Sequence, residues 1–193
     1  RLPVVLLAAL AAAGVFLFLR TRSGIFASLF GAFAMAALPH FALVARQSIT
    51  DMPFLALMTL GMLLFLHGFL LDEDAPAAPF FHRAGPRRPS GFEWTVALAV
   101  SLPVLLQYFV FAPRVQASFA WDGRPVAISG WLVFLPYLIL LADVLWGIFR
   151  GRFSVAQLWM LPGVVLCALA VLAKGFGALF IPAAVFLLYF LLT

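Results

Sequence analysis

Charged residues are scarce in this chain. Only 10% of its 193 residues are Asp, Glu, Lys or Arg, whereas 66% are hydrophobic. A water-soluble domain carries about 25% charged residues, so this composition excludes a free-standing soluble protein. The apolar runs are continuous over roughly 17–24 residues, the length that a helix needs to cross about 30 Å of hydrocarbon. Barrel strands alternate apolar and polar residues instead. The sequence therefore predicts an all-α, polytopic transmembrane helical bundle.

Cysteine and metal-binding patterns are nearly absent. The single cysteine, Cys167, lies inside an apolar run, so no disulfide can form within the chain. No His, Cys or carboxylate pair has metal-ligand spacing, and we expect no metal and no cofactor. No phosphate-binding glycine loop, nucleophile elbow or nucleic-acid surface is recognisable. The formal net charge of +5 comes from arginines in short loops, which indicates topology and lipid headgroups rather than nucleic acid.

Apolar spans account for most of the sequence. About seven are expected, separated by short turns, by a cytoplasmic Pro- and Arg-rich linker at 72–92, and by a loop at Pro113–Pro125. No soluble domain or internal repeat is visible, so residues 1–193 form one transmembrane domain. The chain begins at Arg1 without Met, and we expect an internal fragment of a larger protein. The spans are Leu2–Leu19, Ile25–Val44, Phe54–Leu71, Phe92–Phe111, Val126–Phe149, Val155–Ala173 and Ala178–Leu192.

The basic residues divide unevenly between alternate loops. The positive-inside rule places the richer side in the cytoplasm. That side holds Arg20, Arg22, Arg83, Arg87, Arg88, Arg150 and Arg152, and the other holds Arg46, Arg114, Arg124 and Lys174, with Arg1 at its edge. The turn at Ala45–Pro53, the Pro113–Pro125 loop and the Lys174 turn therefore fall on the non-cytoplasmic face.

Arg46, Asp51 and Lys174 are the charges set closest against span ends on that face. A carboxylate can accept or orient a proton, and cations can hold a phosphate through charge-assisted hydrogen bonds. The grouping suits chemistry on a lipid phosphate. Structural roles stay open, because Asp51 before Pro53 is also a common helix start. Arg46 and Lys174 could equally be interfacial residues whose charged ends reach the headgroups.

The remaining polar residues of the spans have simpler interpretations. Asp143 lies about two helical turns before Arg150, and we expect these two to pair near the cytoplasmic interface. Glu93 and Trp94 are expected to anchor the start of their span at the interface. His40 is interpreted as an interfacial polar residue, and no role is assigned to His67 or His82.

Three motifs together resemble one family. Arg1-Leu2-Pro3 opens a span, Ala45-Arg46 is followed by Asp51-Met52-Pro53, and Lys174-Gly175 lies in the run 172–179 before Pro182. This layout resembles the polyprenyl-phosphate-sugar-dependent glycosyltransferases of the GT-C fold. Within them it is similar to the branch of protein O-mannosyltransferases and lipid A aminoarabinose transferases.

The resemblance implies a function and a place for the site. The enzyme would move a sugar from a polyprenyl-phosphate donor to a lipid or protein acceptor, with inversion, at the non-cytoplasmic face of a bacterial inner membrane. Asp51 would be a catalytic carboxylate, and Arg46 and Lys174 would bind the donor phosphate. The family's principal acidic motif lies in a loop after its first span, which this sequence lacks. The fragment alone is therefore expected to be inactive.

Two other functions compete with this one. A membrane transporter or flippase would place ionisable groups deep within spans and break helices near the midplane. Asp143 is the only clear intramembrane charge, and it lies near a span end. A non-catalytic membrane subunit would use its charges for topology alone, and its Arg46, Asp51 and Lys174 would lie far apart.

Overall fold

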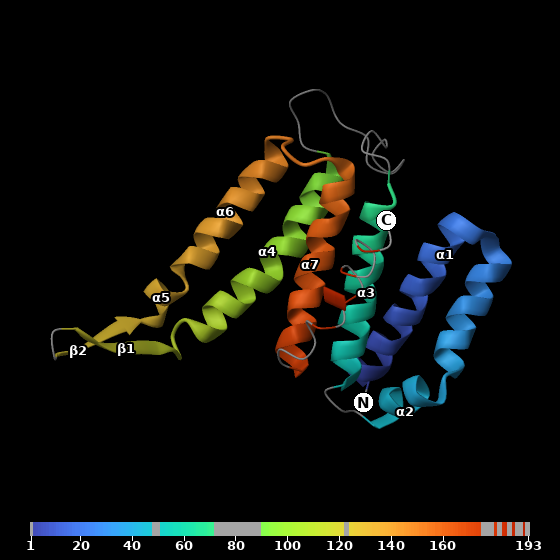
Figure 1. Ribbon diagram of the computed structural model, residues 1–193, viewed down its shortest axis with the longest axis horizontal. Coiled ribbons are helices and arrows are strands. Elements are labelled where there is room, and N and C mark those ends of the chain that lie inside the picture. Colours follow the sequence, from blue (N-terminus) through green and yellow to red (C-terminus); the bar gives the residue numbers. More distant parts are fainter. Residues whose placement is uncertain are drawn as a thin grey trace. The chain divides into compact units, whose positions relative to one another are not determined.

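The computed structural model describes residues 2–47, 51–71, 90–121 and 124–174, and isolated positions from 180 onward (Figure 1). Helices make up most of this part of the chain, and five of them are long and apolar enough to cross a membrane. The prediction of a polytopic helical membrane protein is confirmed to this extent. Two compact units are present, Arg1–Leu71 with Trp159–Thr193 and Asp72–Leu158, and each is described by itself.

The first unit begins with a helical hairpin. Helix α1 (Leu2–Ala37) contains a break at Gly24, whose φ of 80° suits a residue without a Cβ. Its two limbs lie side by side in Figure 1, and Gly31 of the second limb faces Val15 and Leu19 of the first. This arrangement matches the first predicted span, the turn after it and the beginning of the second span.

The second predicted span, Ile25–Val44, is not one helix. α1 ends at Ala37, and a separate helix α2 (Pro39–Gln47) follows after Leu38. Pro39 explains the break, because proline has no N–H for the helix interior but fits the first turn of a new helix. Phe41 and Val44 of α2 are buried while the polar His40 is exposed. The short helix is therefore amphipathic.

Helices α3 (Asp51–Phe69) and α7 (Val155–Lys174) pack tightly within the first unit. A Cβ on Gly61 of α3 would lie 2.7 Å from the Cys167 sulfur and 2.8 Å from the Gly163 oxygen. The two backbones are therefore almost in contact. Phe54 packs with Ala170, near the start of α3 and the end of α7. The two helices thus run antiparallel.

Helix α3 runs parallel to the first limb of α1. Gly14 of that limb faces Leu60 and Leu63 of α3, and Phe18 lies 6.5 Å from His67 between ring centroids. The alternating directions required by the predicted topology are thus present in this unit. A buried apolar cluster joins α1, α2 and α3 at one end and consists of Ala8, Ala11, Phe41, Val44, Met52 and Ala56.

The second unit is built on α4 (Gly91–Phe111) and α6 (Leu135–Phe149), which run antiparallel. At one end the rings of Trp94 and Phe149 are 4.7 Å apart between centroids. At the other end Tyr108 lies 5.3 Å from the ring of Trp131 and donates a hydrogen bond to its carbonyl oxygen. Aromatic side chains at both ends of a helix pair are typical of the two membrane–water interfaces.

Glu93 was expected to anchor the start of α4 at the interface, and the structure gives it a more specific role in the helix cap. Ser90 caps the helix, with its backbone N–H donating to Glu93 Oε2 at 2.6 Å and its hydroxyl accepting from the Glu93 N–H. Ser-x-x-Glu is the sequence pattern of this reciprocal cap. Trp94 remains exposed at the same end, as an interface anchor would be.

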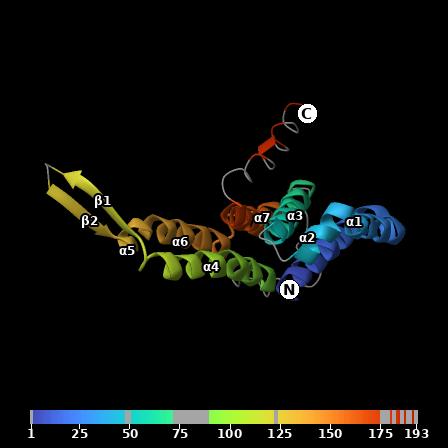
Figure 2. The same ribbon diagram turned by 90° about the horizontal axis from the view of Figure 1, so that it is seen from below.

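A β-hairpin replaces the loop predicted at Pro113–Pro125. Strands β1 (Gln116–Trp121) and β2 (Arg124–Ser129) pair antiparallel, with Gln116 opposite Ser129, and lie side by side in Figure 2. The fifth span consequently begins at Gly130, with the short helix α5 (Gly130–Val133), and not at Val126. Asp-Gly at 122–123, between runs rich in aromatic and β-branched residues, is a strong hairpin pattern that outweighs the apolar character of this stretch.

Two predicted segments cannot be compared with the structure in full. The linker at 72–92 falls outside the described residues up to position 89. The seventh span, Ala178–Leu192, is described at isolated positions only. The first six predicted spans correspond to six helical segments when the two limbs of α1 are taken separately.

Candidate functional site

Asp51 and Lys174 meet across the α3–α7 pair. Asp51 lies in the first turn of α3 and Lys174 is the last residue of α7. Because the two helices are antiparallel, these ends are neighbours, and the Lys174 Nζ lies 2.9 Å from Asp51 Oδ1. The structure thus brings together two of the three charges that were expected on one face, from distant parts of the sequence.

The charges suit the helix ends that carry them. A carboxylate is favourable at the N-terminus of α3, and an ammonium at the C-terminus of α7, by about 0.3–1 kcal/mol each. The Asp51 side chain is 38% exposed and that of Lys174 is 50% exposed. At such exposure an ion pair contributes about 0–1 kcal/mol. The pair is therefore a modest contributor to stability, and both groups stay within reach of a ligand.

Buried apolar side chains pack next to the Asp51–Lys174 pair. The Lys174 Nζ is 5.4 Å from the centre of the Phe54 ring, within cation–π range. Phe54 is itself buried in a cluster with Met58 and Ala170, and Met52, next to Asp51, is fully buried. These anchors hold the first turn of α3, so the positions of both charged groups are set by the packed interior.

Arg46 lies one element earlier, near the end of α2. Its side chain falls outside the described part of the structure, as do residues 48–50. α2 packs through Phe41 and Val44 into the cluster that contains Met52. The helix that carries Arg46 and the helix start that carries Asp51 therefore share one patch of core.

The opposite end of the first unit carries aromatic and basic residues. His67 lies 5.0 Å from Trp159 between ring centroids, with the two rings edge to face. Arg22 lies over Phe18, with its guanidinium carbon 5.3 Å from the ring centre. No role was expected for His67, and its surroundings are those of a packed interfacial ring. His40, on α2, is exposed as expected.

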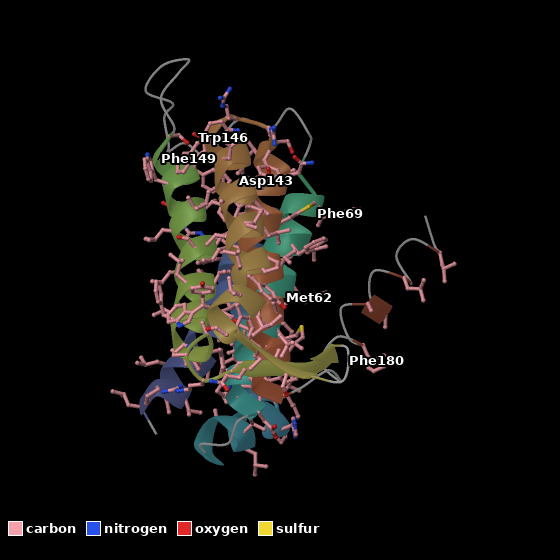
Figure 3. All side chains as sticks on the ribbon, turned by 90° about the vertical axis from the view of Figure 1, so that its left-hand side faces the viewer. Met62, Phe69, Asp143, Trp146, Phe149 and Phe180 are labelled. Carbon is pink, nitrogen blue, oxygen red and sulfur yellow. The ribbon has the colours of Figure 1, made fainter. Side chains whose placement is uncertain are left out.

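The sequence suggested that Asp143 pairs with Arg150, but in the structure its partner is Arg152. Asp143 Oδ1 lies 3.6 Å from Arg152 Nη1, while the Arg150 guanidinium stacks 4.4 Å from the centre of the Trp146 ring. Gly151, with a φ of 68°, turns the chain back after α6 and brings Arg152 toward the helix. Figure 3 shows Asp143, Trp146 and Phe149 on the last turns of α6.

Within the described residues, no three His, Cys, Asp or Glu side chains gather in a way that could hold a metal ion. Comparison of the chain with protein-family models, curated proteins and solved structures found no match. What the chain offers on its own is an acid–base group beside a cation, at one end of a membrane helix pair.

Proposed function

We propose that the protein is a membrane glycosyltransferase of the GT-C type, which moves a sugar from a polyprenyl-phosphate donor to a lipid or protein acceptor at the non-cytoplasmic face. The observation that supports this most is the contact between Asp51 and Lys174 at 2.9 Å. A group that handles a proton and a group that binds phosphate are then within one substrate's reach.

The chemistry assigns a separate role to each charge. The acceptor oxygen forms a bond to the anomeric carbon as the bond from that carbon to the phosphate oxygen breaks, which inverts the centre. The electron pair leaves on the polyprenyl phosphate, where Lys174 and Arg46 stabilise the negative charge. The acceptor proton passes to a carboxylate, which Asp51 provides or supports. The principal carboxylate implied by the resemblance belongs to a part of the protein outside this sequence.

A transporter or flippase fits the helices less well. Ionisable groups on a transport path lie deep in the membrane. In the described helices, Asp51, Glu93 and Lys174 lie in first or last turns, Arg20 and Arg22 lie beside the break of α1 at Gly24, and Asp143 lies near a span end. The bundle edge, rather than its middle, is where this chain concentrates charge.

The test is sugar transfer by the full-length protein in isolated membranes, using a polyprenyl-phosphate sugar as donor. We expect Asp51→Asn and Lys174→Ala each to lower turnover by about 100-fold or more, the usual size of an acid–base or charge-stabilising contribution. Asp143→Asn and Arg152→Ala break the Asp143–Arg152 ion pair and serve as matched controls with unchanged turnover. Near-wild-type turnover in both site variants would remove these residues from the mechanism.

Unfolding does not account for the loss of turnover expected in Asp51→Asn and Lys174→Ala. An ion pair this exposed contributes about 0–1 kcal/mol, so its removal leaves the protein folded. Membrane abundance and thermal unfolding in detergent, measured on the same preparations, should match the wild type within that margin.

A further inference from the structure

We propose that the Asp51–Lys174 ion pair is a latch that the donor phosphate opens. The inference rests on the proposed function and adds an order of events to it. In the free protein each charge neutralises the other, so neither is available for chemistry. Binding of the donor's phosphodiester to Lys174 displaces Asp51 and frees its carboxylate for the acceptor.

The geometry makes the carboxylate a competitor of the phosphate. Asp51 Oδ1 lies 2.9 Å from the Lys174 Nζ and takes one of its three N–H donors. The carboxylate charge also repels a phosphate that approaches the same ammonium group. A phosphate bound at Lys174 therefore works against Asp51, and removing the Asp51 charge should strengthen its binding.

The surroundings let this exchange occur without rearrangement of the helices. Lys174 is half exposed and its ammonium lies over the buried Phe54 ring, which stays in place when the ion pair opens. The donor phosphodiester carries one negative charge shared by its two non-bridging oxygens, and charge-assisted hydrogen bonds to them are strong enough to replace a solvent-screened carboxylate. Only the lysine and aspartate side chains need to move.

The order of binding follows from the exchange. Before the donor arrives, the Lys174 ammonium group holds one oxygen of the Asp51 carboxylate. After the phosphate takes its place, the carboxylate faces an acceptor with the leaving group already held. The donor is therefore expected to bind before the acceptor.

The test measures binding of a short-chain polyprenyl-phosphate sugar, the donor itself, to the purified full-length protein, without acceptor. We expect Asp51→Asn to bind it about two- to fivefold more tightly than the wild type, the strengthening that loss of a weak competing ion pair allows. Asp51→Glu should restore the wild-type affinity because it restores the charge. Lys174→Ala should weaken binding, and Asp143→Asn should leave it unchanged.

Equal or weaker binding by Asp51→Asn would overturn the latch. Two further probes, inorganic phosphate and phosphatidylglycerol vesicles, distinguish a prenyl-phosphate site from general anion or headgroup binding. Competition by neither supports the proposal, and full competition by the vesicles contradicts it. If Asp51→Asn lowers turnover but does not tighten binding, the proposed function survives and the latch fails. If it tightens binding and leaves turnover unchanged, the latch survives and the catalytic role of Asp51 fails.

Discussion

Two ion pairs in the described part of the chain, Asp143–Arg152 and Asp51–Lys174, are built in different ways. Asp143 and Arg152 lie a short turn apart in the sequence, their closest atoms are 3.6 Å apart, and their side chains are 73% and 61% exposed. Asp51 and Lys174 come from distant parts of the sequence, approach to 2.9 Å, and are less exposed, above a buried Phe54 ring. The first pair follows from a local turn, whereas the second exists only because α3 and α7 pack together.

This difference indicates where function is to be sought. A screened ion pair contributes about 0–1 kcal/mol in either place, so stability alone gives little reason to bring two charges together from distant segments. A local pair of this kind needs no further explanation. The distant pair also combines two chemically complementary groups at one end of a membrane bundle. Experiments that treat the two pairs identically should therefore give different results.

Exchange of the two charges gives the largest expected difference. Asp51→Lys combined with Lys174→Asp keeps the ion pair but places each group on the wrong helix. We predict that sugar transfer stays about 100-fold or more below the wild type, because the proton acceptor and the phosphate-binding cation have changed places. The matched exchange, Asp143→Arg with Arg152→Asp, should retain activity. Recovery of transfer by the first exchange would mean that Asp51 and Lys174 only join two helices.

Disrupting the close contact between α3 and α7 gives the next largest effect. Gly61→Leu forces a side chain against the backbone of α7, where the Gly163 oxygen lies 2.8 Å from the Cβ position. Overpacking against backbone costs about 1–3 kcal/mol. Gly147→Leu in the second unit meets the Phe153 ring first, a side chain rather than backbone, and should cost less. Thermal unfolding in detergent measures both, and equal shifts would argue against a tight α3–α7 contact.

Substitutions at the starts of α4 and α3 give the smallest expected change in stability. Ser90→Ala removes the cap of α4 and should lower stability by about 0.5–2 kcal/mol with no change in turnover. Asp51→Asn at the start of α3 should do the reverse, with a stability loss below about 1 kcal/mol and a large loss of turnover. Comparing unfolding temperature with transfer rate for the two variants separates a residue that supports the fold from one that serves the reaction. The distinction fails if both variants lose stability and activity in the same proportion.

The sequence predicted the parts of the structure that depend on apolar length. Continuous apolar runs gave the helices, and Asp51-Met52-Pro53 marked the start of α3. It also suggested that Asp51 and Lys174 share a face, because alternation of the spans requires it. These features are local or follow from counting membrane crossings, and neither kind needs knowledge of packing.

Other features depended on local patterns that apolar length conceals. The hairpin β1–β2 was taken for a loop and the start of a span, although Asp-Gly at 122–123 is a recognisable turn pattern. Pro39 was placed inside a span that it divides. The choice of Arg152 over Arg150 as the partner of Asp143 is set by the turn at Gly151. The Gly61–Gly163 contact depends on tertiary packing, which isolated glycines in two spans do not reveal.

Crosslinking in membranes tests most directly whether α3 and α7 build one charged site at the non-cytoplasmic surface. Cys167, the one cysteine of this sequence, is replaced by Ala together with any cysteine elsewhere in the full-length protein, and Asp51→Cys is combined with Lys174→Cys. A short, membrane-impermeant bifunctional thiol reagent is then added to right-side-out vesicles. We predict efficient crosslinking of this pair, and none when Thr21→Cys replaces Asp51→Cys, because Thr21 lies near the tip of the α1 hairpin. The opposite outcome, no crosslink between positions 51 and 174 or crosslinking only after the vesicles are opened, would contradict the proposed site.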